Sequence, residues 1–137
     1  MQPPYTLFRT MRADTDGQPV VGRGFSMLGV RIAGPQPDIR ILDDGTIMPE
    51  AGGMSAFIDP RRMPKSLRPR NLPEKPGESP FPCFSIVDAK LPSTLVFRKD
   101  KPYHGLVEPR EQCALEEYER QLGATRTHWK VAYGAPE

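Results

Sequence analysis

The sequence predicts a single α+β domain, residues 1–137, built mainly from short strands. Proline accounts for 17 of the 137 residues and glycine for 12, which leaves little room for long helices and favours many ordered loops. Short apolar or alternating runs recur along the chain, and one amphipathic helical pattern follows near the C-terminus. A chain of this length can bury one core, and no repeat or linker divides it.

The first half of the chain predicts five short strands separated by turns. In the first strand Tyr5, Leu7 and Arg9 alternate onto one face. Asp44-Gly45 is a typical turn pair, and we expect it to connect a short hairpin. The expected strands are residues 5–12, 27–32, 39–42, 46–48 and 55–58.

The second half predicts a long loop, three strands and one helix. Residues 59–80 contain six prolines, which predicts a long loop that could serve as a mobile lid. Apolar residues at helical spacing predict a helix over 110–122, with Pro109 in its first turn and Gly123 closing it. Residues 127–133 fit either an edge strand or a packed tail. The three strands expected between the loop and the helix are 83–88, 94–100 and 103–108.

Composition limits the classes of function. A content of 26% charged and 37% hydrophobic residues is typical of a soluble globular protein rather than a disordered one. The net charge of +2 is too small to indicate nucleic-acid binding by itself. No apolar stretch approaches the ~20 residues of a membrane span, and the N-terminus lacks the layout of a cleaved signal. We therefore expect no membrane association, and a protein that acts in the cytosol or leaves the cell without a cleaved signal.

Several common functional motifs are missing from the sequence. It contains no GxxxxGK[ST] phosphate loop, no GxGxxG after a strand and no GxSxG nucleophile turn. Cys83 and Cys113 lie far apart, and we expect a buried reduced pair rather than a disulfide. The two histidines and two cysteines have no local spacing that predicts a metal site.

Three features could carry chemistry, and each also has a purely structural interpretation. Arg9 lies inside an apolar strand, where it needs an anionic partner if it points inward and is an ordinary surface residue if it points outward. Gly52 and Gly53, just before Ser55, form either a turn or a stretch of bare backbone that a ligand can approach. His104 heads a short strand and is either structural or catalytic.

Charged residues add two further candidates. The proline-rich loop contains a basic run at residues 61–70, which is either a solvated surface or a binding site for a phosphorylated or nucleic-acid partner. Glu108, at the end of a predicted strand, is the candidate catalytic carboxylate, and it would equally suit the positive end of the following helix. The basic run consists of Arg61, Arg62, Lys65, Arg68 and Arg70.

The order of these segments resembles a known family. It is similar to the ADP-ribosyltransferase-like toxin domain of a small type VI secretion effector family, in which a cytosol-acting toxin is neutralised by a cognate immunity protein. The resemblance covers roughly residues 5–129. It rests on LFR (7–9), GGMSAF (52–57), LPSTLVFRKD (91–100), YHGLVEP (103–109), LEEYERQL (115–122) and Trp129.

The resemblance implies an ADP-ribosyltransferase-like split β-sheet and a place for each candidate. Arg9 matches the first-strand arginine that faces NAD, and Ser55 matches the serine beside the nicotinamide-ribose. His104 matches a histidine near the same cleft. The family's type member has threonine before that serine, whereas this chain has Met54, so a single hydroxyl replaces a pair.

The chemistry of NAD cleavage suits these assignments. Breaking the nicotinamide–ribose bond passes through an oxocarbenium-like state, which needs a pyrophosphate clamp, a dock for nicotinamide and negative charge near the ribose. Arg9 would be the clamp, and Tyr103 would stack on the nicotinamide. Gly52 and Gly53 would let backbone groups approach the ligand. Glu108 is the strand-end candidate for the negative charge.

Two functions are therefore expected as alternatives. The first is an NAD-dependent mono-ADP-ribosyltransferase-like toxin with NAD as its substrate, a protein or RNA target and a cognate immunity protein. An NAD glycohydrolase is a variant of this first function. The second is a catalytically inactive binding module on the same fold, which uses the basic loop 61–70 to bind a protein or an RNA.

Overall fold

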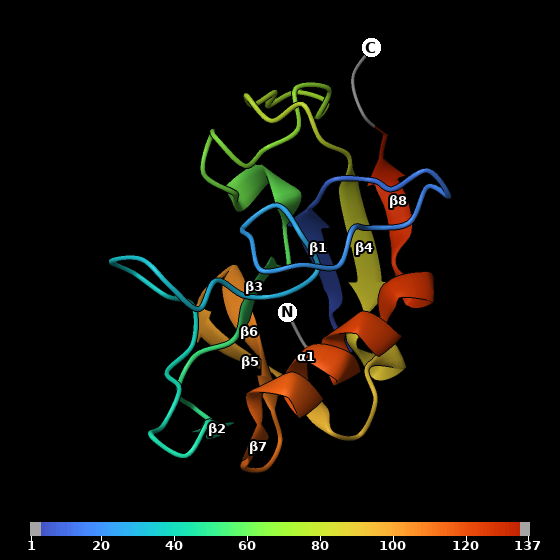
Figure 1. Ribbon diagram of the computed structural model, residues 1–137. Coiled ribbons are helices and arrows are strands. Elements are labelled where there is room, and N and C mark those ends of the chain that lie inside the picture. The colour runs from blue at the N-terminus through green and yellow to red at the C-terminus, as the bar shows by residue number, and fades with distance from the viewer. Residues whose placement is uncertain (1–3, 135–137) are drawn as a thin grey trace.

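A six-stranded antiparallel sheet runs through the molecule (Figure 1). The computed structural model describes residues 4–134. The strand order is β5-β6-β3-β1-β4-β8, and two short strands, β2 and β7, form a separate ribbon. The strands are β1 (Thr6–Thr10), β2 (Thr46–Ile47), β3 (Met54–Phe57), β4 (Cys83–Val87), β5 (Leu95–Lys101), β6 (His104–Pro109), β7 (Cys113–Ala114) and β8 (Lys130–Tyr133).

The sheet consists of two three-stranded halves that meet at one point. Strands β1 and β4 pair at five positions, and β5 and β6 pair at six. At the junction of the halves, β1 and β3 pair only at Phe8 and Phe57. Beyond this pair the facing backbones of β1 and β3 need other hydrogen-bond partners.

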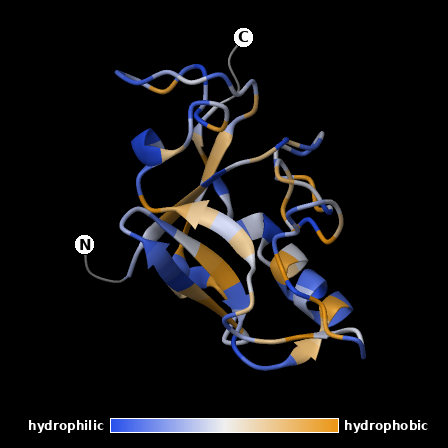
Figure 2. Ribbon diagram, turned by 90° about the vertical axis from the view of Figure 1, so that its left-hand side faces the viewer, coloured by the Kyte–Doolittle hydropathy of each residue, from blue (hydrophilic) through white to orange (hydrophobic). Residues whose placement is uncertain are grey.

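The helix α1 (Leu115–Ala124) packs against one side of the sheet (Figure 1). Its apolar side chains Leu115, Tyr118 and Leu122 are buried, as expected for residues at helical spacing. In Figure 2 both the strands and α1 show hydrophobic and hydrophilic stretches. Each large side chain buried in this way stabilises the fold by about 1.5–3 kcal/mol. Short 3₁₀ turns at Pro60–Arg62, Asp88–Lys90 and Arg126–His128 complete the regular structure.

The Tyr118 hydroxyl connects the helix to two strands. It donates a hydrogen bond to the Val107 carbonyl at 2.6 Å and accepts one from the Met54 amide at 3.0 Å. Met54 and Val107 are register partners of β3 and β6, so the phenol stands between the two strands at this position. Burial raises the pKa of Tyr118, which keeps the hydroxyl protonated and able to donate.

The structure confirms the predicted α+β class and most of the predicted strands. Observed strands lie within or overlap the segments predicted at 5–12, 55–58, 83–88, 94–100 and 103–108. Residues 59–80 form the predicted long loop apart from one 3₁₀ turn. The C-terminal segment, for which two interpretations were open, is the edge strand β8. No helix of the described residues is long and apolar enough to cross a membrane.

Three predicted elements are wrong in place or extent. Residues 27–32 form no strand: the carbonyls of Met27 and Gly29 accept from the Arg9 side chain, and Leu28 forms only an isolated bridge with Val21. The hairpin of 39–42 with 46–48 is replaced by pairing of β2 with β7, although the turn at 44–45 is present. The helix begins at Leu115 rather than 110, because Cys113–Ala114 extends to pair with β2. It also continues through Gly123.

Candidate functional site

Arg9 points into the protein and is surrounded by backbone oxygen atoms. Its guanidinium donates to the Met27 carbonyl from Nε at 3.1 Å and from Nη2 at 2.8 Å, and to the Ser55 carbonyl from Nη1 at 2.8 Å. Longer bonds of 3.4 Å reach the carbonyls of Gly24 and Gly29. The outward orientation left open by the sequence is therefore not adopted. The partners of Arg9 are carbonyl groups rather than a carboxylate.

This environment makes Arg9 a positioning residue for the surrounding backbone. The residue is only 7% exposed. Burial lowers the pKa of its guanidinium to about 10, so it remains charged at neutral pH. Its bond to the Ser55 carbonyl spans the junction where β1 and β3 stop pairing, and thus takes the place of a missing ladder bond. Little of the guanidinium remains available to a ligand.

The glycine pair before Ser55 serves close backbone packing. Gly52 has a φ of +106°, which favours glycine, and a Cβ at this position would collide with the Asp38 carbonyl. A Cβ at Gly53 would collide with the Val107 carbonyl. The Gly53 amide also donates to the Asp38 carbonyl at 2.9 Å. The space next to both glycines is occupied by the chain itself, which corresponds to the turn interpretation of this motif.

Ser55, His104 and Asp100 form a continuous hydrogen-bonded row. The Ser55 Oγ lies 2.8 Å from the His104 Nε2, and the His104 Nδ1 lies 2.6 Å from the Asp100 Oδ1. An ionised carboxylate can only accept hydrogen bonds, so Nδ1 carries a proton. In the neutral ring Nε2 is then the acceptor, and the Ser55 hydroxyl donates to it. This is the order of groups that activates a serine hydroxyl as a nucleophile.

A bulge in β5 directs Asp100 toward the histidine. Lys99 pairs with Gly105 and Lys101 pairs with His104, so Asp100 is an extra residue without a partner in the ladder. Such bulges bend the strand and re-aim a side chain. The ring of Phe57 packs edge-on against the His104 imidazole, with ring centroids 4.8 Å apart. This contact restricts the orientation of the imidazole.

A cleft of about 470 Å³ opens at Ser55 and His104. Its rim carries two cations, Arg62 and Lys101, and the aromatic ring of Tyr103. The Arg62 guanidinium stacks on the Tyr103 ring, 4.4 Å from its centroid. Among residues 4–134, neither cation forms an ion pair within 4.0 Å. The remaining lining residues are Phe57, Pro64, Leu67 and Pro102.

Glu108 lies apart from this cleft and is paired within the protein. The side chain is 1% exposed and forms a two-pronged ion pair with Arg98, at 2.8 and 2.7 Å. It lies on β6 near Gly53, where a Cβ would approach the Glu108 Cγ. The structure therefore brings Ser55 and His104 together at one cleft but directs the Glu108 carboxylate to a different partner.

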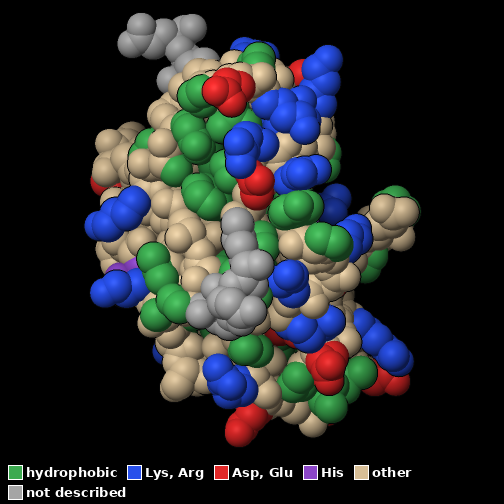
Figure 3. Space-filling model, turned by 180° about the vertical axis from the view of Figure 1, so that it is seen from behind, with side chains coloured by type: hydrophobic (Ala, Val, Ile, Leu, Met, Phe, Trp, Pro, Cys, Tyr) green, Lys and Arg blue, Asp and Glu red, His purple; other side chains and the backbone are tan. Residues whose placement is uncertain are grey.

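Most of the basic run at 61–70 is used to hold its own loop. Arg61 pairs with Asp59 at 3.2 Å, and Arg68 donates to the Met63 carbonyl at 3.0 Å. Arg70 donates to the carbonyl of Glu78. Figure 3 shows several Lys and Arg side chains together at the top of the back face, at the height of this loop in Figure 1.

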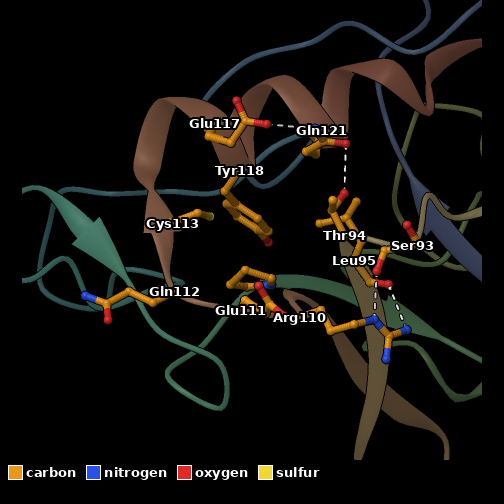
Figure 4. A pocket seen from close by; sticks show the side chains of 11 residues that line it. Ser93, Thr94, Leu95, Arg110, Glu111, Gln112, Cys113, Glu117, Tyr118 and Gln121 are labelled. Atoms are coloured by element: carbon orange, nitrogen blue, oxygen red, sulfur yellow. Dashed lines mark hydrogen bonds between the residues drawn. The ribbon is translucent and has the colours of Figure 1, made fainter.

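A second cavity, of about 290 Å³, lies between the start of α1 and the ends of β5 and β6 (Figure 4). Its polar side chains bond to neighbouring groups of the chain. Thr94 donates to Gln121 at 2.8 Å, Gln121 donates to Glu117 at 2.9 Å, and Arg110 donates to the Ser93 carbonyl at 2.7 Å. None of the site residues predicted from the sequence lines this cavity.

Sequence reasoning missed the roles of Asp100 and Arg62. Asp100 stands four residues before His104, a spacing that brings the two together only because the intervening hairpin is short and bulged. That spacing was the one available signal. In the sequence Arg62 is one member of the basic run, and its contact with Tyr103 depends on how the long loop folds back. The described residues contain no group of three or more potential metal ligands.

Comparison with protein-family models and with curated proteins found no match to this chain.

Proposed function

We propose that this protein is an NAD-dependent ADP-ribosyltransferase-like enzyme that cleaves the nicotinamide–ribose bond in the cleft at Ser55 and His104. The main support for the proposal is that residues from distant segments of the chain lie in contact at one place. Arg9, Ser55 and His104, named by the family resemblance, are connected through two hydrogen bonds of 2.8 Å. They meet at the junction of two half-sheets, a division that suits the split sheet of that fold.

The chemical character of the cleft suits a dinucleotide. Its rim offers an aromatic ring at Tyr103 and cations at Arg62 and Lys101, which are complementary to the aromatic rings and the pyrophosphate of NAD. Ser55 supplies a hydroxyl for the ribose at the base of the cleft. The Asp100 carboxylate, acting through the His104 ring, supplies negative charge that favours an oxocarbenium-like state.

The proposed roles differ from the sequence expectation for Arg9 and for Glu108, whose expected place near the ribose is taken by the Asp100 carboxylate. Arg9 shapes the site by holding the backbone at Ser55, and Arg62 with Lys101 takes over the binding of the pyrophosphate. Entry of nicotinamide at Tyr103 requires Arg62 to leave the ring face, where it now stacks. The phosphate groups of the ligand offer this cation an alternative partner.

In its biological setting we propose that the enzyme acts as a toxin in the cytosol of a target cell and is neutralised by an immunity protein. This proposal rests on the family resemblance. The modification target is a protein or an RNA, and hydrolysis of NAD alone is the variant without a target.

Calorimetry and nicotinamide release test the proposal directly. The wild-type protein should bind NAD and release nicotinamide. Ser55→Ala and His104→Ala should lower the rate of release by at least about tenfold. Ser93→Ala and His128→Ala change exposed residues away from the cleft and serve as matched controls. Absence of NAD binding by the folded wild type, together with normal growth of cells that express it, would falsify the enzymatic function.

The second proposal, a binding module that uses loop 61–70, makes a different prediction. Replacement of Lys65 and Arg62 by alanine would abolish binding of a protein or RNA partner, and wild-type binding would weaken steeply with added salt. Under the enzymatic proposal, Lys65→Ala leaves NAD turnover unchanged because Lys65 does not line the cleft.

A further inference from the structure

We propose that Ser55 is an activated nucleophile that attacks carboxylic esters bearing an anionic group, with His104 as the general base and Asp100 as its positioning residue. This goes beyond NAD cleavage, because it assigns a covalent acyl-transfer activity to the cleft. It does not depend on NAD binding.

The hydrogen-bonded row provides the first argument. The bond from Ser55 to His104 has an ordinary length of 2.8 Å, and the bond from His104 to Asp100 is short at 2.6 Å. The carboxylate fixes the proton on Nδ1, so that Nε2 is free to take the proton of the hydroxyl. An ordinary cross-strand contact between serine and histidine does not need the carboxylate behind it.

The backbone provides a second, independent argument. Asp100 occupies the extra position of a bulge, which interrupts the ladder between β5 and β6. The Arg9 guanidinium bonds to the carbonyl of Ser55, so the backbone that carries the hydroxyl is held in place. Ser55 and His104 both line the open cleft, so a substrate can reach the hydroxyl.

The proposed reaction balances without any further cofactor. The Ser55 Oγ bonds to the carbonyl carbon of the ester as its proton passes to the His104 Nε2. The bond from that carbon to the alkoxy oxygen then breaks, and the leaving alcohol takes the proton from Nε2. Water hydrolyses the acyl-Ser55 ester by the same proton transfers, which returns the free serine and releases a carboxylic acid.

The cations at the rim indicate which esters are preferred. Arg62 and Lys101 line the same cleft as Ser55, and neither is neutralised by an ion pair among the described residues. A substrate with a carboxylate or phosphate remote from its ester group would bind both cations. The preferred substrate class is therefore an anionic ester rather than a neutral one.

Labelling with a fluorophosphonate tests the nucleophile. Intact-mass measurement of the purified full chain should show one adduct, and peptide mapping should place it on Ser55. Ser55→Ala should take no label, and the exposed Ser93→Ala should label like the wild type. Asp100→Asn should slow labelling by between about 10²- and 10⁴-fold, because an amide no longer holds the proton on Nδ1.

Ester hydrolysis tests the substrate class. The 4-nitrophenyl half-ester of suberic acid, which carries a remote carboxylate, should be hydrolysed with a higher kcat/KM than the neutral 4-nitrophenyl octanoate of equal chain length. Arg62→Ala should lower this preference by about two- to fivefold, the effect of losing one exposed ion pair, with Lys101 still present. Equal kcat/KM values for the two esters, or a preference that Arg62→Ala leaves intact, would overturn the anionic preference.

Labelling has two outcomes that overturn the proposal. One is the absence of an adduct on wild-type protein that unfolds cooperatively on heating. The other is equal labelling of Asp100→Asn and wild type. If His104→Ala fails to fold, Asp100→Asn still decides the question, because Asp100 lies near the surface, where its side chain is 27% exposed. Labelling on Ser55 without NAD cleavage would support this inference and remove the NAD proposal.

Discussion

The Arg9 guanidinium and the Ser55 backbone carbonyl are joined by a hydrogen bond of 2.8 Å between residues 46 positions apart. The bond ties β1 to β3 where the two half-sheets no longer pair. It also means that a buried charge fixes the backbone of the residue whose hydroxyl faces the cleft. Stability and site geometry are thus coupled through Arg9.

Replacing Arg9 tests this coupling. Arg9→Ala leaves the carbonyls of Met27 and Ser55 without their side-chain donors, and we expect the free energy of unfolding to fall by at least about 3 kcal/mol. Chemical denaturation measures the loss. The exposed Arg40→Ala should change stability by less than about 0.5 kcal/mol. An Arg9→Ala protein as stable as the wild type would show that the guanidinium does not support the backbone.

Tyr118→Phe removes only the hydroxyl that stands between β3 and β6. The Met54 amide and the Val107 carbonyl would each lose a buried partner, so we expect a loss of about 1–3 kcal/mol in the free energy of unfolding. Tyr133→Phe, on the edge strand, provides the matched control. Equal effects of the two substitutions in denaturant titrations would contradict the proposed bridging role.

Glu108→Gln tests whether the Glu108 carboxylate has a structural or a catalytic role. Because Glu108 is buried against Arg98, we expect a loss of about 1–3 kcal/mol in stability. Because the side chain does not line the cleft, the rate of nicotinamide release should change by less than about threefold. Glu111→Gln, which alters an exposed carboxylate, is the control. A large fall in rate with unchanged stability would instead place Glu108 in catalysis.

The two cysteines should differ in reactivity. Both are free thiols, but Cys83 is fully buried and only Cys113 is partly exposed, so the expected buried pair is wrong for Cys113. Burial raises the pKa of Cys83 to about 12, which keeps it as an unreactive thiol. Iodoacetamide should modify Cys113 in the native protein and reach Cys83 only after unfolding. Mass spectrometry of Cys113→Ser should therefore show no native labelling.

Acid should weaken the ion pair between Asp16 and Arg126. The Arg126 side chain, hydrogen-bonded to Asp16, lowers the pKa of that carboxyl. Because the folded pKa is the lower one, the stabilisation is present above the ordinary carboxyl value of about 4 and is lost as the pH falls through the folded value.

Melting curves of wild type and Asp16→Asn check this prediction. The Tm difference between them should be constant near neutral pH and should shrink below about pH 4. Asp43→Asn alters another exposed carboxylate and controls for the change in net charge. A Tm difference that persists unchanged at low pH would show that the ion pair does not contribute.

The sequence predicted those parts of the fold that depend on local pattern. Alternation predicted β1 and short apolar runs predicted β3, β4, β5 and β6, because apolar side chains in these segments must reach one core. The pattern failed at 27–32, where the Met27 carbonyl binds the Arg9 side chain, 18 residues away, and Leu28 forms only an isolated bridge with Val21. Pairing of β2 with β7 joins segments far apart in the chain, and no local signal marks such a contact.

The sequence predicted several residues of the candidate site, but it predicted their roles less well. Ser55 and His104 were both named from the sequence, and they meet in the structure. Arg9 was expected to bind an anion, but long-range folding of the 20–29 segment supplied carbonyl partners. Asp100 was overlooked because a bulge is invisible in a residue pattern.

The bulge at Asp100 has a consequence for how this site could arise or disappear. A sheet with Lys99 followed directly by Lys101 would continue its ladder without interruption. Loss of a single codon would therefore yield a more regular hairpin and at the same time remove the carboxylate behind His104. Homologous chains one residue shorter in this hairpin would be natural deletion variants, which keep the scaffold and lack the carboxylate behind His104.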